Sequence, residues 1–315
     1  MSSPEPARVR CPDCGKTVGA LAGEPACPGC RRRFVEEAGV WDLLPTVRES
    51  VKVNEDLVHV DAGLPTWRRL FMHKRYWLEW CDTDWLPTIV DGRTRKFLEI
   101  GGGLCYASAL AKARAPGAYV VATDISPRYL RQQAVNVGRV LGAMPDVHAA
   151  ADAEALPFDD GQFDAIYSQI VLYRLPDPAR ALREIERVLA PGGRYLGIER
   201  ASPWASPWYA REARTMRARS GPLGLAERPI RYREWEAILR TAGTPATLAP
   251  VPGHRVRAPW LRRLGNAVRP IYVAIRLTSP DGPAAGRPFG GRHDRHGQAA
   301  RGRAQVVPPK APGRS

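Results

Sequence analysis

The sequence lacks a long hydrophobic run. Nowhere in its 315 residues is there an uninterrupted apolar stretch of about 18 residues, the length that a transmembrane helix needs. The first residues, MSSPEPARVRCPDC, also lack the apolar centre of a secretory signal. Both absences predict a cytoplasmic protein without a transmembrane segment. In that compartment the six cysteines are expected as thiols or metal ligands rather than as disulfides.

Lysine and aspartate are missing from a long part of the C-terminal third. Between Arg200 and Pro280 the sequence has fifteen Arg and four Glu, but no Lys and no Asp. The net charge of +15 comes entirely from residues 200–315, because residues 1–199 sum to about −1. This asymmetry predicts an anionic partner such as nucleic acid, lipid headgroups or a phosphorylated substrate. The alternative is a solvated arginine-rich surface without a specific partner.

Four of the cysteines form two C-x-x-C pairs, each on a turn rich in Pro and Gly: Cys11 with Cys14, and Cys27 with Cys30. This spacing is typical of a four-thiolate zinc site. Four protein ligands complete the tetrahedron and leave no open position for a substrate, so we expect structural Zn²⁺. The metal would compensate for the small core of a ribbon over residues 1–45. A redox role is not favoured, because no βαβ pattern surrounds either pair.

The stretch KFLEIGGGLC at Lys96–Cys105 has the pattern of a cofactor loop. It reads as a buried strand that ends in an acidic residue, followed by three glycines and an Ala/Leu-rich helix. A second strand, Tyr119–Thr123, ends at Asp124, about twenty residues past the glycines, where a nucleotide-binding unit places a carboxylate for ribose hydroxyls. Further strands are expected at Val147–Ala150, Ala165–Ser168 and in RYLGIE after Pro191–Gly193.

Strands that alternate with helices predict a parallel α/β sheet. Ligands of such sheets bind beyond the carboxyl ends of the strands. Four features fall at these ends: Gly101–Gly103, Asp124, Asp152 and Ser168.

Four segments taken together resemble the signature segments of class I S-adenosylmethionine-dependent methyltransferases, in the methyltransferase type 11-like branch that includes quinone methyltransferases: LEIGGG, VVATDIS, ADAEALPFDDGQFDAIYS and LPDPARALREIERVLAPGGRYL. The resemblance spans about residues 95–200. It implies a doubly wound, seven-stranded Rossmann-like sheet and S-adenosylmethionine as cofactor.

The same resemblance implies roles for individual residues. Glu99 with the backbone of Gly101 and Gly103 would hold the methionine part, and Asp124 the ribose. Asp152 and Ala153 would meet the adenine. The full set of cofactor-binding residues implied in this way is Glu99, Gly101, Gly103, Asp124, Ile125, Asp152, Ala153, Ser168 and Gln169.

Two departures from the family pattern bear on the loop and on catalysis. Cys105 stands where the family has a third glycine, and Tyr173-Arg174 stand where many relatives carry histidines. Tyr173 would either orient a nucleophile or pack, and His254 is the other catalytic candidate. A dinucleotide dehydrogenase is excluded by the fingerprint, because the position of its third glycine is Tyr106.

The N-terminal segment CPDC…CPGCRRRF…GVWDLLP, Cys11–Pro45, also has relatives. It resembles the zinc ribbon in front of some methyltransferases, including bacterial ribosomal-RNA guanine methyltransferases, and small activator proteins that partner transfer-RNA methyltransferases.

The remaining segments complete the expected organisation. Residues 46–94 form a helical connector rich in aromatics, which either packs on the core or acts as a lid. Residues 95–280 form the methyltransferase domain, with a substrate-covering insertion at about 200–230. A basic helix at 260–275 packs on the body or, alternatively, contacts a membrane surface. Residues 281–315 form a disordered basic tail.

Three functions fit these features. The favoured one is transfer of a methyl group from S-adenosylmethionine to a small or medium-sized acceptor such as a metabolite, glycan or lipid-linked intermediate. The alternative is an RNA methyltransferase, acting on rRNA or tRNA through the ribbon and the basic region, but no Asn-Pro-Pro-Tyr-like motif follows the fourth strand. The second alternative, a non-catalytic zinc-ribbon interaction protein, is opposed by the presence of Glu99, Asp124 and Asp152.

Overall fold

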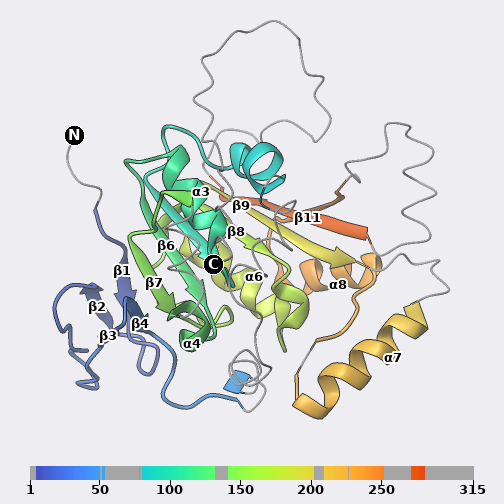
Figure 1. Ribbon diagram of the computed structural model, residues 1–315, viewed down its shortest axis with the longest axis horizontal. Helices are drawn as coiled ribbons and strands as arrows, with labels where there is room; N and C mark the ends of the chain where they lie inside the picture. The colour runs from blue at the N-terminus through green and yellow to red at the C-terminus, as the bar shows by residue number, and fades with distance from the viewer. Residues whose placement is uncertain are drawn as a thin grey trace, which may run out of the picture. The chain divides into compact units, whose positions relative to one another are not determined.

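The computed structural model describes most of the chain up to residue 280 (Figure 1). The described residues are 5–49, 52–53, 78, 80–131, 141–201, 209–225, 227–251 and 271–280. The chain divides into two units, Met1–Ala284 and Ala285–Ser315, and all described residues belong to the first. The predicted basic tail therefore lies outside the described residues.

A nine-stranded mixed sheet forms the centre of the described part of the chain (Figure 1). Its strands from β9 through β8, β5, β6 and β7 to β4 are parallel to one another, whereas β10, β11 and β3 pair antiparallel with their neighbours. In spatial order the strands are β10 (Thr247–Pro250), β11 (Ile271–Thr278), β9 (Leu189–Ala201), β8 (Phe163–Gln169), β5 (Lys96–Ile100), β6 (Tyr119–Asp124), β7 (Val147–Ala150), β4 (Val40–Asp42) and β3 (Glu36–Glu37).

The seven strands from β10 to β7 are the predicted doubly wound sheet, which is confirmed. The chain runs outward from β5 through β6 to β7, returns to β8 on the other side of β5, and continues to β9. The order therefore reverses between β5 and β8, the place where ligands of open α/β sheets bind. The other two strands, β4 and β3, come from the ribbon and were not predicted as part of this sheet.

Both faces of the central strands are covered, as parallel sheets require. In β5, Phe97, Leu98 and Ile100 are buried on alternating faces. The covering helices include α3 (Tyr106–Arg114), which contacts β5 and β6, and α6 (Pro178–Val188), which packs on α8 (Tyr232–Ala242).

The helix α6 shows how the local sequence sets these boundaries. The side chain of Asp177 caps it by accepting a hydrogen bond from the backbone N–H of Arg180 at 3.0 Å, and Pro178 occupies the first turn. Its buried face consists of Ala181, Leu182, Ile185 and Val188, together with Pro178 and Ala179. These positions follow the helical period, so α6 is amphipathic, with its apolar side in the core.

The glycine turn after α6 does not separate helix from strand in the way predicted. β9 already begins at Leu189, which pairs with Phe163. The next pair joins Ala165 and Arg194. More residues therefore lie between the paired positions on β9 than between those on β8. Pro191–Gly193 therefore forms a bulge inside the strand, because a proline without an N–H and two flexible glycines tolerate an interrupted ladder.

The predicted helix at 260–275 is wrong at its C-terminal end. Ile271–Thr278 is strand β11, which lies between β9 and β10 and buries Val273, Ala274, Ile275 and Leu277. The run IYVAIRLT is short, apolar and rich in β-branched residues, which suits a strand covered on both faces. Residues 260–270 lie outside the described residues.

Much of the aromatic connector also lies outside them, namely residues 50–51, 54–77 and 79. The described end consists of two short helices, η1 (Cys81–Trp85), a π-helix, and η2 (Leu86–Thr88), a 3₁₀ helix. Trp85 is fully buried and meets the ring of Trp80 edge to face at 6.1 Å. At this end the aromatic side chains pack in the core, and the lid over a substrate stays a prediction.

Helices able to cross a bilayer are absent from the described residues, where no helix is both long and apolar enough.

Candidate functional site

The sheet brings three carboxylates to neighbouring strand ends. Glu99 is the penultimate residue of β5, Asp124 ends β6, and Asp152 lies two residues past β7. Ladder pairs between Glu99 and Ala122, and between Asp124 and Ala150, place these ends side by side. The predicted clustering at one edge of the sheet is therefore present in the structure.

The glycine loop between β5 and α3 depends on the absence of side chains. Gly101 has φ +63°, and a Cβ atom there would lie 2.8 Å from Cγ1 of Val171 and closer still to Cγ2. Gly103 has φ +55°, and its Cβ would lie 3.2 Å from Cε1 of Tyr129. At each position a side chain would be disfavoured for two reasons, the left-handed backbone and the close neighbour, so both positions favour glycine.

Cys105 adopts a backbone conformation that usually favours glycine. It is the N-cap of α3 with φ +53°, a left-handed conformation that L residues rarely adopt. Its side chain is buried with Val40, Ala122 and Leu130. Cysteine at this position is therefore compatible with the turn, but its left-handed backbone is strained where that of a glycine would not be.

Glu99 is buried and bonded to the helix that follows the loop. Its Oε2 accepts hydrogen bonds from the backbone N–H of Ser108 at 2.7 Å and from the Ser108 hydroxyl at 2.6 Å. Burial raises the pKa of Glu99 to about 7, although these hydrogen bonds oppose the shift. Glu99 thus joins β5 to α3, and contact with a methionine group stays a prediction.

Asp124 organises two turns at once. One carboxylate oxygen accepts from the N–H of Gly103 at 2.9 Å, and the other accepts from the N–H of Ser126 at 3.0 Å. Ser126 in turn caps α4 (Pro127–Tyr129) by accepting a hydrogen bond from the N–H of Tyr129. Ile125, between them, is half-buried. Asp124 therefore connects the glycine loop to the strand beside it.

Asp152 has a charged partner that sequence analysis missed. The ammonium of Lys52 lies 2.7 Å from Oδ2 of Asp152 and 2.8 Å from Oε2 of Glu154. The other oxygen of Asp152 accepts from the N–H of Glu154 at 2.9 Å. Ala153, between the two acids, is also buried. Lys52 comes from the connector, a hundred residues earlier, and a single lysine in a polar segment carries no sequence signal.

Ser168 and Gln169 end β8 beside this cluster of strand ends. The Ser168 hydroxyl is fully buried and lies 2.8 Å from the hydroxyl of Tyr195. The side-chain oxygen of Gln169 accepts hydrogen bonds from the hydroxyls of Tyr106 and Tyr167. Ile170, the next residue, has φ +59°. A β-branched residue is strained in this region, and strain of this kind concentrates at ligand sites.

The cysteine cluster lies in the ribbon, which also contains the small hairpin of β1 (Arg8–Arg10) and β2 (Thr17–Ala20). The Sγ atoms of all four predicted ligands lie within 4.8 Å of one another. Two of the separations are short, 3.5 Å between Cys11 and Cys30 and 3.4 Å between Cys14 and Cys27. Zinc with four thiolates at about 2.3 Å places its sulfur atoms about 3.8 Å apart, so the arrangement fits that ion.

The ribbon is fastened to the sheet at several points. β4 pairs in parallel with β7, and the N–H of Leu43 extends the ladder to the carbonyl of Ala150 at 2.9 Å. On the other side of the ribbon, the Arg10 side chain meets Asp159 at 3.0 Å and Asp160 at 3.1 Å.

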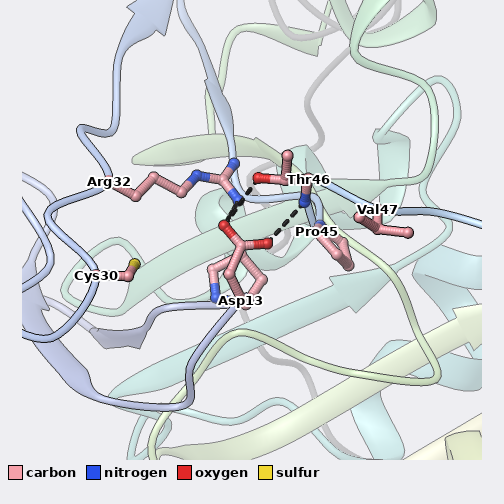
Figure 2. Close-up of a pocket in the computed structure, with 7 residues that line it drawn as sticks. Asp13, Cys30, Arg32, Pro45, Thr46 and Val47 are labelled. Carbon is pink, nitrogen blue, oxygen red and sulfur yellow. Dashed lines mark hydrogen bonds and ion pairs between the residues drawn. The ribbon is translucent and has the colours of Figure 1, made fainter.

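The segment that leaves the ribbon is held by a residue of the first cysteine turn (Figure 2). Asp13 accepts hydrogen bonds from the N–H of Thr46 at 2.7 Å and from its hydroxyl at 2.9 Å. The guanidinium of Arg32 lies 2.8 Å from the same carboxylate. A pocket beside this clamp is lined by Pro12, Asp13, Cys30, Arg32, Pro45, Thr46 and Val47.

Comparison with known proteins concerns the sheet. Residues 98–197 match the methyltransferase domain family. The demethylmenaquinone methyltransferase of Thermus thermophilus is 38% identical over 112 residues, which cover 35% of this chain and 49% of that protein. The ubiquinone/menaquinone biosynthesis C-methyltransferase UbiE of Pasteurella multocida is 35% identical over 114 residues, covering 36% and 42%.

Residues 98–197 are therefore similar to the methyltransferase domains of these relatives. The chain spans half or less of the length of these two relatives. The fold is also that of a solved Haemonchus contortus phosphoethanolamine N-methyltransferase 2, with a TM-score of 0.51 and 14% identity, covering 75% of this chain and 61% of that one.

A buried glutamate shapes the loop after β8 of the methyltransferase domain. Glu199 accepts hydrogen bonds from the N–H groups of Val171 at 3.0 Å, Leu172 at 2.9 Å and Tyr173 at 3.4 Å. Burial raises the pKa of Glu199 to about 7, against the effect of these three donors. It holds the start of η4 (Leu172–Arg174) opposite Gly101. Sequence analysis missed Glu199, because an acid inside a strand gives no sign of which backbone it will meet.

The catalytic candidates of the methyltransferase domain stay predictions. The Tyr173 hydroxyl donates a hydrogen bond to Glu227 at 2.8 Å, and Glu227 also accepts from the Ser220 hydroxyl at 2.6 Å. Burial raises the pKa of Tyr173 above its ordinary value. These contacts favour the packing interpretation of Tyr173, since its proton is already engaged. His254 lies outside the described residues.

Proposed function

We propose that the protein transfers the methyl group of S-adenosylmethionine to a small or medium-sized acceptor. The observation that carries the proposal is the set of three carboxylates, Glu99, Asp124 and Asp152, at adjacent strand ends around a glycine loop. The match of residues 98–197 to methyltransferases supports the same donor.

The residues present fit this donor. Gly101 and Gly103 keep the loop free of side chains, so that the backbone can approach the methionine part. Asp124 offers two carboxylate oxygens for the ribose hydroxyls. In this proposal Asp152 would accept a hydrogen bond from the adenine amine, and Ala153 would meet the ring edge.

Catalysis then rests mainly on placement. The donor supplies a methyl group on a sulfonium, which is already activated toward attack. The domain has to hold the acceptor in line with that methyl group and exclude water. A strong base is needed only where the acceptor is a weakly acidic hydroxyl or amine.

For the acceptor we favour a small, quinone-like ring compound over RNA or a glycan. The names of the two aligned relatives, both methyltransferases of quinone biosynthesis, support this choice. RNA stays the alternative because of the arginine-rich region after Arg200.

We also propose that the ribbon holds one structural zinc ion through Cys11, Cys14, Cys27 and Cys30. The mutual proximity of the four sulfur atoms supports this. Metal analysis of the purified protein should find one zinc per chain, and serine in place of Cys14 should lower that content.

Calorimetry with S-adenosylhomocysteine tests the donor site. Asp124→Ala should weaken binding by at least about 100-fold, because two hydrogen bonds to a charged group are lost at about 1.5–3 kcal/mol each and every 1.4 kcal/mol is a factor of about ten. Asp146→Ala is the matched control. Asp146 is also an aspartate that accepts a hydrogen bond from a backbone N–H, that of Val120 at 2.8 Å, but it precedes β7 and so lies away from the carboxyl ends of the strands. Unchanged binding in Asp124→Ala, or no binding by the wild-type protein, would refute the donor assignment.

Transfer of labelled methyl groups into a fractionated cell extract tests the acceptor. Label in solvent-extractable small molecules supports the proposal. Label in RNA contradicts it and supports the alternative. Donor binding without label in any fraction supports the non-catalytic alternative.

A further inference from the structure

The lysine beside Asp152 is unusually well buried. Lys52 is 8% exposed, while Asp152 and Glu154 are 4% and 2% exposed. A third acid, Glu49, lies 3.7 Å from the same ammonium but is largely in solvent. Buried ions of this kind are stable only when each is paired and hydrogen-bonded.

Each of the two buried carboxylates has one backbone hydrogen bond and an ion pair with Lys52. Asp152 accepts one hydrogen bond from the N–H of Glu154, and Glu154 accepts one from the N–H of Asp177 at 2.7 Å. Lys52 supplies the charged contact to both, at 2.7 and 2.8 Å. Among the contacts of the described residues, no other cation reaches either acid.

We propose that Lys52 is a positioning residue of the donor site, which fixes the carboxylate of Asp152 for recognition of the adenine amine. The inference rests on the proposed function. Each oxygen of a carboxylate accepts about two hydrogen bonds, so Oδ2 of Asp152 can hold the ammonium and still accept from an amine. Without Lys52, two buried acids would face each other with no counter-ion, and Asp152 would lose its orientation.

The ribbon anchors the segment that carries this lysine. The Asp13 clamp fixes Thr46 at the point where the segment leaves the ribbon, six residues before Lys52 (Figure 2). The N–H of Leu43 is bonded to β7, the strand that leads into Asp152. The ribbon therefore fixes the start of the segment that carries Lys52 to the adenine end of the proposed donor site, besides extending the sheet.

Two ligands and three variants test the proposal by calorimetry. The ligands are S-adenosylhomocysteine and its purine analogue, in which hydrogen replaces the 6-amino group. Lys52→Met removes the charge, and Lys52→Arg keeps it. Lys112→Met is the matched control, because Lys112 forms a 2.8 Å ion pair with Asp146 just before β7, away from the strand's carboxyl end.

The expected result depends on the ligand. Lys52→Met should weaken S-adenosylhomocysteine binding about tenfold, since a charge-assisted hydrogen bond loses its orientation. It should change binding of the purine analogue less than about twofold, because that ligand makes no hydrogen bond to Asp152. Lys52→Arg should recover most of the affinity, and Lys112→Met should bind both ligands as the wild type does.

An equal loss with both ligands would overturn the proposal, since it would mean a general structural effect, and so would unchanged binding of S-adenosylhomocysteine. If Lys52→Met does not fold, Glu154→Gln decides. This variant removes the charge of Glu154, so that Lys52 pairs with Asp152 alone. Binding of S-adenosylhomocysteine should then be unchanged or tighter, and a tenfold loss would overturn the proposal. A wild-type protein that binds neither ligand refutes the proposed function itself, which separates the two failures.

Discussion

Replacing Gly101 by alanine should destabilise the protein through two separate effects. The backbone there has φ +63°, and an L residue in the left-handed region costs about 1–2 kcal/mol. The new Cβ would also lie 2.8 Å from Cγ1 of Val171, and such overpacking typically costs about 1–3 kcal/mol. The two effects together predict a loss of about 2–5 kcal/mol in the free energy of unfolding.

Chemical denaturation of a small set of variants separates the two effects. Gly142→Ala is the control for the backbone alone, because Gly142 has φ +69° with nothing within 4 Å of its Cβ position. It should cost about 1 kcal/mol. Val171→Ala removes the atoms that the new methyl group would meet. The double variant Gly101→Ala/Val171→Ala should therefore be more stable than additivity predicts, by about 1–3 kcal/mol.

Additive losses in the double variant would refute this reasoning, because they would show that Val171 does not restrict the loop. A Gly101→Ala protein as stable as Gly142→Ala would refute it as well. Binding of S-adenosylhomocysteine, measured on the same variants, shows whether the loop geometry matters for the donor.

Three further predictions concern other parts of the molecule. Removing the metal with a chelator, or Cys14→Ser, should lower the melting temperature and expose the ribbon to proteolysis, because the thiolate cluster replaces a core there; unchanged melting would contradict a structural metal. Burial raises the pKa of Glu99 from 4.5 to about 7, so the folded state holds a proton that the unfolded chain releases, and this stabilisation is lost as the pH rises from about 4.5 to about 7. The stability of Glu99→Gln relative to the wild type should therefore rise by on the order of 3 kcal/mol between about pH 5 and about pH 8. The melting temperatures of the two proteins should diverge over this range, and parallel pH curves would refute the prediction. Tyr173→Phe should reduce stability by about 1–3 kcal/mol, because buried Glu227 loses a donor, while leaving the rate of methyl transfer unchanged; a large drop in rate at full donor occupancy would instead support Tyr173 as a catalytic residue.

Local patterns sufficed to predict the central sheet. The strand before the glycines, the acid after β6 and the amphipathic helix α6 each carry their signal within about ten residues, and parallel strands bring their carboxyl ends together. The cysteine spacing likewise predicted a cluster that the structure forms. Such features depend on chain geometry alone, so a single sequence reveals them.

The missed features depend on partners far apart in the sequence. Lys52 meets Asp152 across a hundred residues, and Glu199 meets the backbone of Val171 across twenty-eight. The apolar run at Ile271–Thr278 matched the helical period as well as the strand period, and its place between β9 and β10 decided between them. Likewise, a zinc ribbon has no sequence sign that says which surface its strands will join.

The ribbon's strands also decide what this end of the sheet offers to other molecules. Without β4, strand β7 would present a row of unpaired N–H and C=O groups, which is a template for unwanted strand addition. With it, the sheet ends at β3, two residues long and made of Glu36 and Glu37, both exposed. An edge only two residues long offers few N–H and C=O groups for another strand to pair with, so the ribbon protects the methyltransferase domain from edge-to-edge aggregation.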